Sequence, residues 1–130
     1  IAYPRVVAPD LVVMMSQAAY DKYAAERPAN SILIVDEDLV ELDDELERGR
    51  SVLKAPATRL AEKLGRRIIA NIVMLGFICG ATRLVSLEVM REAVASSVPR
   101  GTETLNLQAV EAGHERALEV LAGMERGEGG

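Results

Sequence analysis

The stretch DLVVMMSQAAYDKYAAERPANSILIVDED, residues 10–38, decides the expected fold. It contains two short apolar runs, residues 10–15 and 31–38, of the kind found in strands that are covered on both faces. Between them, Ser16 is a good N-cap and Pro28 a common helix terminator, so a helix is expected there. A strand, a short helix and a second strand predict a right-handed βαβ unit with parallel pairing.

The rest of the chain is expected to add one strand and then to become helical. Residues 51–55, SVLKA, are predicted as a third strand. Serine caps, boundary prolines and glycines, and apolar periodicity predict helices at residues 56–65, 68–81, 86–99 and 106–126. The last helix is expected to bury one face made of Leu107, Val110, His114, Ala117 or Leu118, and Leu121. These elements predict an α/β fold: a three-layer, mostly parallel, doubly wound Rossmann-like sheet with a helical C-terminal half.

Composition excludes several classes of protein. The chain of 130 residues is 49% hydrophobic and 27% charged, which is typical of one globular domain. Its net charge of −5 and its 3% aromatic content disfavour a nucleic-acid binder, which needs basic and stacking side chains. The single cysteine, Cys79, excludes an internal disulfide and a cysteine-ligated cluster, and it fits a reducing, cytoplasmic compartment.

Residues 66–81, RRIIANIVMLGFICGA, form the most apolar segment. Residues 68–81 are 14 uncharged residues, whereas a membrane-spanning helix needs about 20, so we expect a buried helix and no membrane span. Gly76 and Gly80 lie one turn apart and would let another backbone approach closely. Asn71 would then need a buried partner, because an unpaired amide costs about 1–3 kcal/mol.

Residues 36–47 hold eight acidic residues in twelve, but they do not form a calcium loop. The sixth position, where an EF-hand needs glycine, is Glu41, so a solvated acidic loop or a frayed helix is expected and no metal site is predicted. His114 is expected to be structural, since no spacing supplies an orienting partner. A Ser16–His114–Asp36 triad lacks the strained Gly-x-Ser-x-Gly turn, and no glycine-rich phosphate loop occurs. No catalytic residue is therefore predicted.

The carboxyl ends of the first two strands carry the candidate binding residues. Ligands of open α/β sheets bind at this edge, where the sequence places Ser16, Gln17 and Asp36. The first two would lie at a helix N-terminus, which favours anionic groups. The alternative is that Ser16 is only a cap and Asp36 only a turn residue.

Five segments in order resemble one known family. They are IAYPRVVAPDLVVMMSQAAYDKY, ILIVDEDLV, PATRLAEKLG, RRIIANIVMLG and PRGTETLNLQAVEAG. Together they resemble the gamma subunit of 2-oxoacid:ferredoxin (acceptor) oxidoreductases, with the 2-oxoglutarate type most similar, and the likeness covers nearly all of the chain. The resemblance implies that residues 1–125 form a partial gamma domain, because the family's opening strand and GxGGQG turn are absent; residues 126–130 are expected to be a disordered tail.

The resemblance also implies a role within a complex. Such enzymes decarboxylate a 2-oxoacid on thiamine diphosphate, pass electrons through iron–sulfur clusters to ferredoxin, and transfer the acyl group to coenzyme A. The partners implied are the thiamine-binding alpha and beta subunits and a ferredoxin-like subunit, with a homodimer as a further possibility. The chain itself is expected to bind no cofactor firmly and to cover the active site or assist the coenzyme A step. Ser16, Gln17 and Asp36 match the family's strand ends.

The resemblance gives the glycine-containing helix a packing partner, either the sheet or a neighbouring subunit. Two further readings of the chain stay open at this point. One is a free-standing α/β module that binds a nucleotide or an acyl-CoA, and the other is a purely structural assembly domain.

Overall fold

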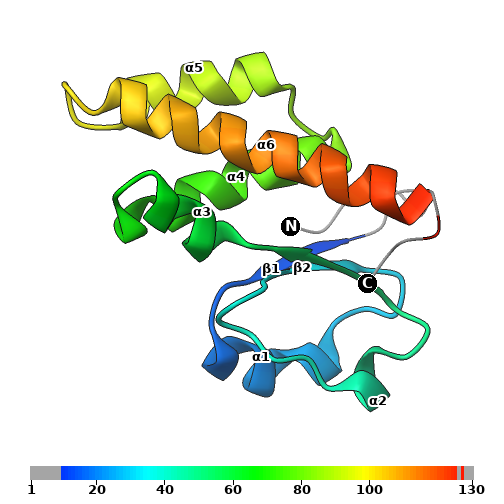
Figure 1. Ribbon diagram of the computed structural model, residues 1–130. Helices are drawn as coiled ribbons and strands as arrows, with labels where there is room; N and C mark the ends of the chain where they lie inside the picture. Colours follow the sequence, from blue (N-terminus) through cyan, green and yellow to red (C-terminus); the bar gives the residue numbers. More distant parts are fainter. Residues whose placement is uncertain (1–9, 126, 128–130) are drawn as a thin grey trace. The chain divides into compact units, whose positions relative to one another are not determined.

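A computed structural model describes residues 10–125 and 127 (Figure 1). The chain divides into two compact units, Ile1–Pro56 and Ala57–Gly130. The expectation of one domain over residues 1–125 stays a prediction. The predicted disordered tail, residues 126–130, lies outside the described residues except for Gly127.

The first unit contains a parallel sheet of three strands, β1 (Leu11–Met14), β2 (Ile32–Asp36) and β3 (Ser51–Ala55), in the order β1-β2-β3. In the register of the central strand, Ile32 lies opposite Leu11 on one side and Ser51 on the other. Three apolar residues of β2 are fully buried, Leu33, Ile34 and Val35, as is Asp36 at its end. The predicted βαβ unit and the third strand are confirmed, because near-continuous apolar runs belong in a parallel sheet that is buried on both faces.

Helix α1 (Gln17–Tyr23) and the short helix α2 (Asp44–Glu47) lie on the same side of this sheet (Figure 1). Ser16 caps α1 as predicted, since its Oγ accepts a hydrogen bond from the amide of Ala19 at 3.1 Å. The predicted helix ends earlier than Pro28, because Ala24–Glu26 form a 3-10 turn and the chain is extended at Arg27. The core between the helices and the sheet is made of Met14, Tyr20, Ala24, Leu33, Val35 and Val40.

The acidic segment, residues 36–47, differs from the expected solvated loop. Val40 is buried in the core, and Leu42 and Leu46 pack against it. Asp36 and Glu47, at its two ends, are also buried. The interpretation was wrong for these two carboxylates, because hydrogen bonds replace the water that their charges would otherwise need: local backbone amides for Asp36, and side chains distant in the sequence for Glu47.

The second unit is helical. It contains α3 (Ala57–Lys63), the 3-10 turn η2 (Arg67–Ile69), α4 (Ala70–Thr82), α5 (Leu87–Ser97) and α6 (Glu103–Glu125). Ser86 caps α5 as predicted, with its Oγ accepting from the amide of Val89. Helix α6 lies against both α4 and α5 (Figure 1). Within residues 10–125, no helix is long and apolar enough to cross a membrane.

Helices α4 and α6 meet backbone to backbone through glycines on both sides. A Cβ at Gly76 would overlap the carbonyl oxygen of Val110 and lie 2.7 Å from its carbonyl carbon. A Cβ at Gly113 would overlap the carbonyl oxygen of Val73 and lie 2.8 Å from the amide nitrogen of Phe77. The predicted close approach is confirmed, but the partner is α6 of the same chain; the sheet and a neighbouring subunit, which we expected, are not what the glycines contact.

This crossing also selects the buried face of α6. The residues buried there are Asn106, Ala109, Val110, Gly113 and Ala117. Leu118, one of the predicted face residues, is 43% exposed, and Leu107 and His114 are half-buried. The predicted face was partly wrong because close packing requires small residues on the inner side, and the larger side chains are displaced to its flanks.

The expectation for Asn71 was wrong. This residue lies in the first turn of α4 and is exposed, so it satisfies no buried group within the chain. The physical reason is its position on the helix: the buried residues Val73, Gly76 and Phe77 lie on the side of α4 that the other helices cover, whereas Asn71 lies on the opposite side.

Candidate functional site

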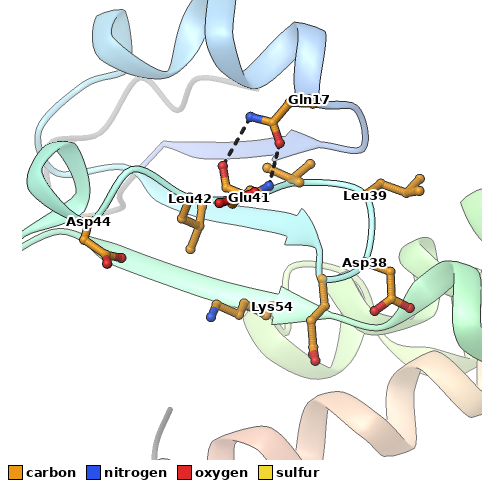
Figure 2. Close-up of a pocket in the computed structure, with 9 residues that line it drawn as sticks. Gln17, Asp38, Leu39, Glu41, Leu42, Asp44 and Lys54 are labelled. Carbon is orange, nitrogen blue, oxygen red and sulfur yellow. Dashed lines mark hydrogen bonds between the residues drawn. The ribbon is translucent and has the colours of Figure 1, made fainter.

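A pocket of about 730 Å³ lies at the carboxyl edge of the first unit's sheet (Figure 2). It is lined by Gln17, Glu37, Asp38, Leu39, Val40, Glu41, Leu42, Asp44 and Lys54. These residues follow β1 and β2 or lie near the end of β3, which is where ligands bind in open α/β sheets. The sequence predicted this edge, and one of the three predicted residues, Gln17, lines the pocket.

Gln17 is hydrogen-bonded to the loop after β2, residues 37–42, which lines much of the pocket (Figure 2). Its Oε1 accepts a hydrogen bond from the amide of Glu41 at 2.6 Å, and its Nε2 donates to the carbonyl oxygen of Glu41 at 3.2 Å. The same Nε2 also donates to Oδ1 of Asp21 at 2.9 Å. The carboxamide therefore pairs with both backbone groups of one loop residue, as a neighbouring strand would, and fixes the loop at its midpoint.

Asp36 and Ser16 do not line the pocket, but they fix backbone segments that lead to its lining residues. The buried Asp36 accepts hydrogen bonds at Oδ1 from the amides of Asp38 and Leu39, at 3.0 and 3.2 Å. It thereby turns the chain out of β2 into the loop. Ser16 caps α1 through Ala19. These contacts are those of a turn residue and a cap, the alternative that the sequence left open; a direct role of the three residues in binding stays a prediction.

The charges around the pocket decide which ligands suit it. Among the described residues that line it, four carry carboxylates, Glu37, Asp38, Glu41 and Asp44, and one carries an ammonium group, Lys54. The carboxylates of Glu41 and Asp44 disfavour phosphate groups, such as those of thiamine diphosphate and coenzyme A, close to that part of the lining. An iron–sulfur cluster needs several thiolates, and the chain has one cysteine. In the part of the chain that the structure describes, no group of three metal-binding side chains is arranged to hold an ion.

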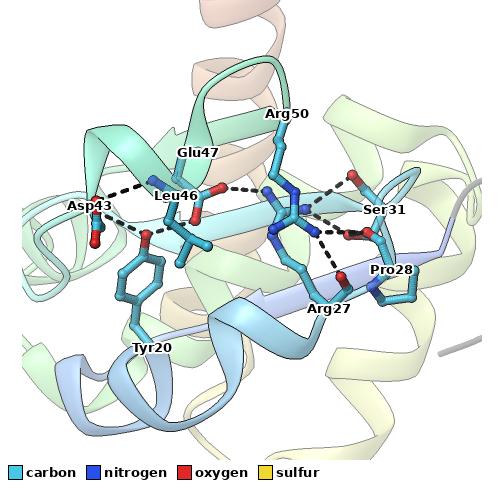
Figure 3. A network of polar contacts seen from close by, with 8 residues as sticks. All are labelled: Tyr20, Arg27, Pro28, Ser31, Asp43, Leu46, Glu47 and Arg50. Carbon is cyan, nitrogen blue, oxygen red and sulfur yellow. Dashed lines mark hydrogen bonds and ion pairs between the residues drawn. The ribbon is translucent and has the colours of Figure 1, made fainter.

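A buried polar network, which the sequence did not reveal, holds the other end of the acidic segment (Figure 3). Arg27 donates to Oε1 of Glu47 at 2.5 Å, and their side chains are only 1% and 7% exposed. Tyr20 donates its hydroxyl proton to Oε2 of Glu47 at 2.6 Å and accepts from the amide of Asp43 at 3.0 Å. No sequence pattern distinguishes Glu47 from the acidic residues around it, so only the fold identifies the pair.

The network continues to the loop before β2. Arg27 also donates to Oγ of Ser31 at 2.6 Å and to its carbonyl oxygen at 3.2 Å. Arg50 donates to the carbonyl oxygens of Arg27 and Pro28, at 2.7 and 3.1 Å. Three connections of the first unit, α1 to β2, the acidic segment, and the entry to β3, are therefore joined by one set of hydrogen bonds.

The network makes Tyr20 hard to ionise. Burial, helped by the hydrogen bond to Glu47 and its negative charge, raises the pKa of Tyr20 from 10.0 to about 12. Below pH 10 the phenol is neutral whether the chain is folded or unfolded. Between the two pKa values the unfolded chain loses the proton first, so stability should fall as pH rises through this window.

We therefore expect Tyr20→Phe to remove a late-ionising phenol from the ultraviolet absorbance titration of the three tyrosines. The same variant should show a shallower loss of stability above pH 10 than the unchanged protein. Tyr23→Phe is the control, because Tyr23 is exposed and lies in the same helix, as the last residue of α1. Loss of an early-ionising phenol in Tyr20→Phe would contradict the assignment.

Cys79 and His114, which the sequence analysis considered as reactive residues, both lie where α4 and α6 pack together. Cys79 is buried in α4, and burial raises the pKa of its thiol, which agrees with an unreactive side chain. His114 is half-buried on α6, and its Cδ2 and carbonyl oxygen lie on the side that Gly80 approaches. Both positions belong to the helix contact of the second unit.

Comparison with known proteins identifies the family. The model of the pyruvate ferredoxin/flavodoxin oxidoreductase family matches residues 1–116. Subunit KorC of 2-oxoglutarate synthase from Methanocaldococcus jannaschii is 45% identical over 121 residues, which cover 92% of this chain and 65% of that subunit. The chain thus spans slightly less than two thirds of the length of this curated relative.

Solved structures share the fold. The gamma subunit of a keto/oxoacid ferredoxin oxidoreductase from Geobacter sulfurreducens has a TM-score of 0.73 and 34% identity, over 90% of this chain and 66% of that one. A 2-oxoglutarate:ferredoxin oxidoreductase from Magnetococcus marinus, with 2-oxoglutarate, coenzyme A and succinyl-CoA bound, has a TM-score of 0.71 at 18% identity, over 83% of this chain and 19% of that one. Parallel strands, a helical C-terminal part and the match over residues 1–116 lead to one conclusion: the chain belongs to the pyruvate ferredoxin/flavodoxin oxidoreductase family.

Proposed function

We propose that the chain is the gamma subunit of a coenzyme A-dependent 2-oxoglutarate:ferredoxin oxidoreductase. The observation that carries the proposal is the 45% identity to a 2-oxoglutarate synthase subunit over 121 residues. The 34% identity to an oxoacid oxidoreductase gamma subunit, which extends over 90% of the chain, supports the same assignment. The complex would be cytoplasmic and would use ferredoxin as its electron acceptor.

The proposed role is to pack against the catalytic subunits and to cover their active site. Thiamine diphosphate and the iron–sulfur clusters would belong to the alpha, beta and ferredoxin-like subunits, as the family resemblance implies, and the single cysteine of this chain is too few to ligate a cluster. The polar side chains at the carboxyl edge are engaged in shaping the loop around the pocket. Any help with coenzyme A would therefore come from covering the bound molecule and excluding water, with no nucleophile supplied by this chain.

Coexpression of the full reading frame with its neighbouring genes tests the proposal. We expect thiamine-binding and cluster-bearing subunits to copurify with this chain, and the complex to reduce ferredoxin when 2-oxoglutarate and coenzyme A are both present. Omission of this chain from the coexpression should abolish the coenzyme A-dependent reaction. A chain that purifies without partners and binds an acyl-CoA by itself in calorimetry would contradict the proposal and favour a free-standing binding module.

A further inference from the structure

A second, smaller hollow lies wholly in the helical unit. Its volume is about 270 Å³, and it is formed by the start of α4 and by the connection between α5 and α6, which is yellow in Figure 1. The volume lies below the range of roughly 300–1,000 Å³ that is usual for small-molecule sites. It suits one or two inserted side chains better than a cofactor.

The walls of this groove are apolar and open to solvent. Ile68 is 76% exposed, more than any other large hydrophobic side chain among the described residues. Ile72, Val98 and Leu105, which also line the groove, are half-buried. One exposed and three half-buried aliphatic side chains therefore surround the hollow, and such a grouping at the surface is typical of an interaction site.

The charge at the groove is opposite to that of the protein. Arg66 lines it, and Arg67 and Arg100 are exposed beside it in the sequence, although the chain as a whole carries a net charge of −5. The connection between α5 and α6 leads to one acidic residue, Glu103, at the start of α6. Its Oε1 accepts a hydrogen bond from the amide of Gly101 at 2.6 Å. The groove therefore has an apolar lining with one arginine, Arg66; this residue and Arg67 and Arg100, which adjoin lining residues in the sequence, are called the arginine rim.

Asn71 completes the surface. It lines the groove, is exposed, and makes no hydrogen bond through its side chain to another residue in the described part of the chain. A carboxamide in this position can pair with a backbone group of a bound polypeptide, as Gln17 pairs with Glu41 elsewhere in this chain. Such pairing is useful at an apolar contact, where a partner's backbone would otherwise lose its hydrogen bonds to water.

We propose that this groove docks an acidic, aliphatic segment of another subunit of the oxidoreductase complex, with aliphatic side chains in the hollow and carboxylates on the arginine rim. The inference rests on the proposed function, because it takes the occupant from that complex. Charge complementarity selects the occupant: an acidic segment gains from the rim, whereas a basic segment would be repelled. The exposed and half-buried residues of the two sequence regions that form the groove, around residues 66–72 and 98–106, then have a common role.

The test measures binding of this chain to the purified remainder of the coexpressed complex. Ile68→Asp places a charge where the proposal buries an aliphatic side chain, so we expect the dissociation constant to rise about tenfold or more. Val89→Asp is the matched control, because Val89 is 56% exposed on α5 and does not line the groove. Arg66→Glu should weaken binding most at low salt, and Arg116→Glu, on α6, should change it little.

A photo-crosslinking residue at position 68 identifies the occupant. We expect a crosslinked peptide from another subunit that contains both acidic and aliphatic residues. A crosslink to a second copy of this chain, for example to its acidic residues 36–47, or to a basic peptide would overturn the proposal. Ile68→Ser, with a smaller change, replaces Ile68→Asp if circular dichroism shows that the aspartate variant is unfolded.

The outcomes distinguish a failure of the groove proposal from a failure of the proposed function. If the complex assembles and Ile68→Asp or Ile68→Ser leaves its affinity unchanged, the groove proposal fails and the gamma-subunit assignment stands. If the unchanged chain binds none of the coexpressed subunits, both fail.

Discussion

Glu47→Ala is expected to lower the free energy of unfolding by about 3–5 kcal/mol, because it leaves the buried guanidinium of Arg27 without its counter-charge. The same change removes the acceptor of the Tyr20 hydroxyl. It should therefore loosen both the acidic segment and the connection from α1 to β2. Urea denaturation followed by circular dichroism measures the loss.

Glu45→Ala is the matched control, since Glu45 lies in the same short helix α2. Its ion pair with Arg48 is on the surface, where the two side chains are 67% and 78% exposed, and such pairs contribute about 0–1 kcal/mol. An equal loss of stability in the two variants would show that burial of the Arg27–Glu47 pair is not the cause.

The double variant Arg27→Met/Glu47→Leu distinguishes the cost of one unpaired charge from the value of the pair. The network leaves Nε of Arg27 without a hydrogen-bond partner in the described structure. The pair is thus incompletely satisfied, and its replacement by apolar side chains should restore most of the stability lost in Glu47→Ala. A double variant as unstable as the single one would mean that the other hydrogen bonds lost with the pair, from Arg27 to Ser31 and from Tyr20 to Glu47, matter more than the unpaired charge.

Gly76→Leu is expected to prevent normal packing of α4 on α6. Even a methyl group at Gly76 would overlap the carbonyl oxygen of Val110, and backbone atoms cannot rotate away as a side chain can. Overpacking typically costs about 1–3 kcal/mol, and we expect the upper end or more, which exceeds the gain of about 1 kcal/mol from replacing a helical glycine. The melting temperature and the recovery of the assembled complex measure the effect.

A graded series tests the cause. Gly113→Ala, on the facing helix, should be as damaging as Gly76→Ala, because its Cβ would also overlap a backbone oxygen. Gly80→Ala should cost less, since its nearest contacts would be at 2.7 and 2.8 Å and one of them is the side chain of Ala117. Ala93→Leu, at an exposed site on α5, is the control and should change stability by about 0.5 kcal/mol or less. Unchanged melting of Gly76→Leu would contradict the close crossing.

Local patterns predicted the elements well because they depend on neighbouring residues. The apolar run before Ser16 became β1, the serine became the cap of α1, and SVLKA became β3 with the expected bounds. The edge that holds the pocket was also predictable, because carboxyl ends of parallel strands meet on one side of a sheet. The helices were found from caps and boundary residues for the same reason.

The failures concern which face of a helix, or which member of a run, becomes buried. Glu47 was indistinguishable from the other acids because its partner, Arg27, lies 20 residues earlier in the chain. Asn71 was placed in the core because its neighbours are apolar, although only one side of α4 is covered by other helices. Periodicity alone left Ala117 and Leu118 as alternatives on the buried face, and the structure buries Ala117, because periodicity cannot detect the small residues that the facing helix demands.

The sequence by itself determined the strands, the existence and approximate positions of the main helices, the parallel βαβ order and the family resemblance, since each follows from short-range chemistry or from the order of segments along the chain. Only the tertiary structure decided that Gly76 meets Val110, that Glu47 is paired in the interior, and that Ile68 is left exposed beside Arg66. The physical reason is that burial and pairing depend on contacts between distant segments. The free energy of each contact exists only after the chain has brought those segments together.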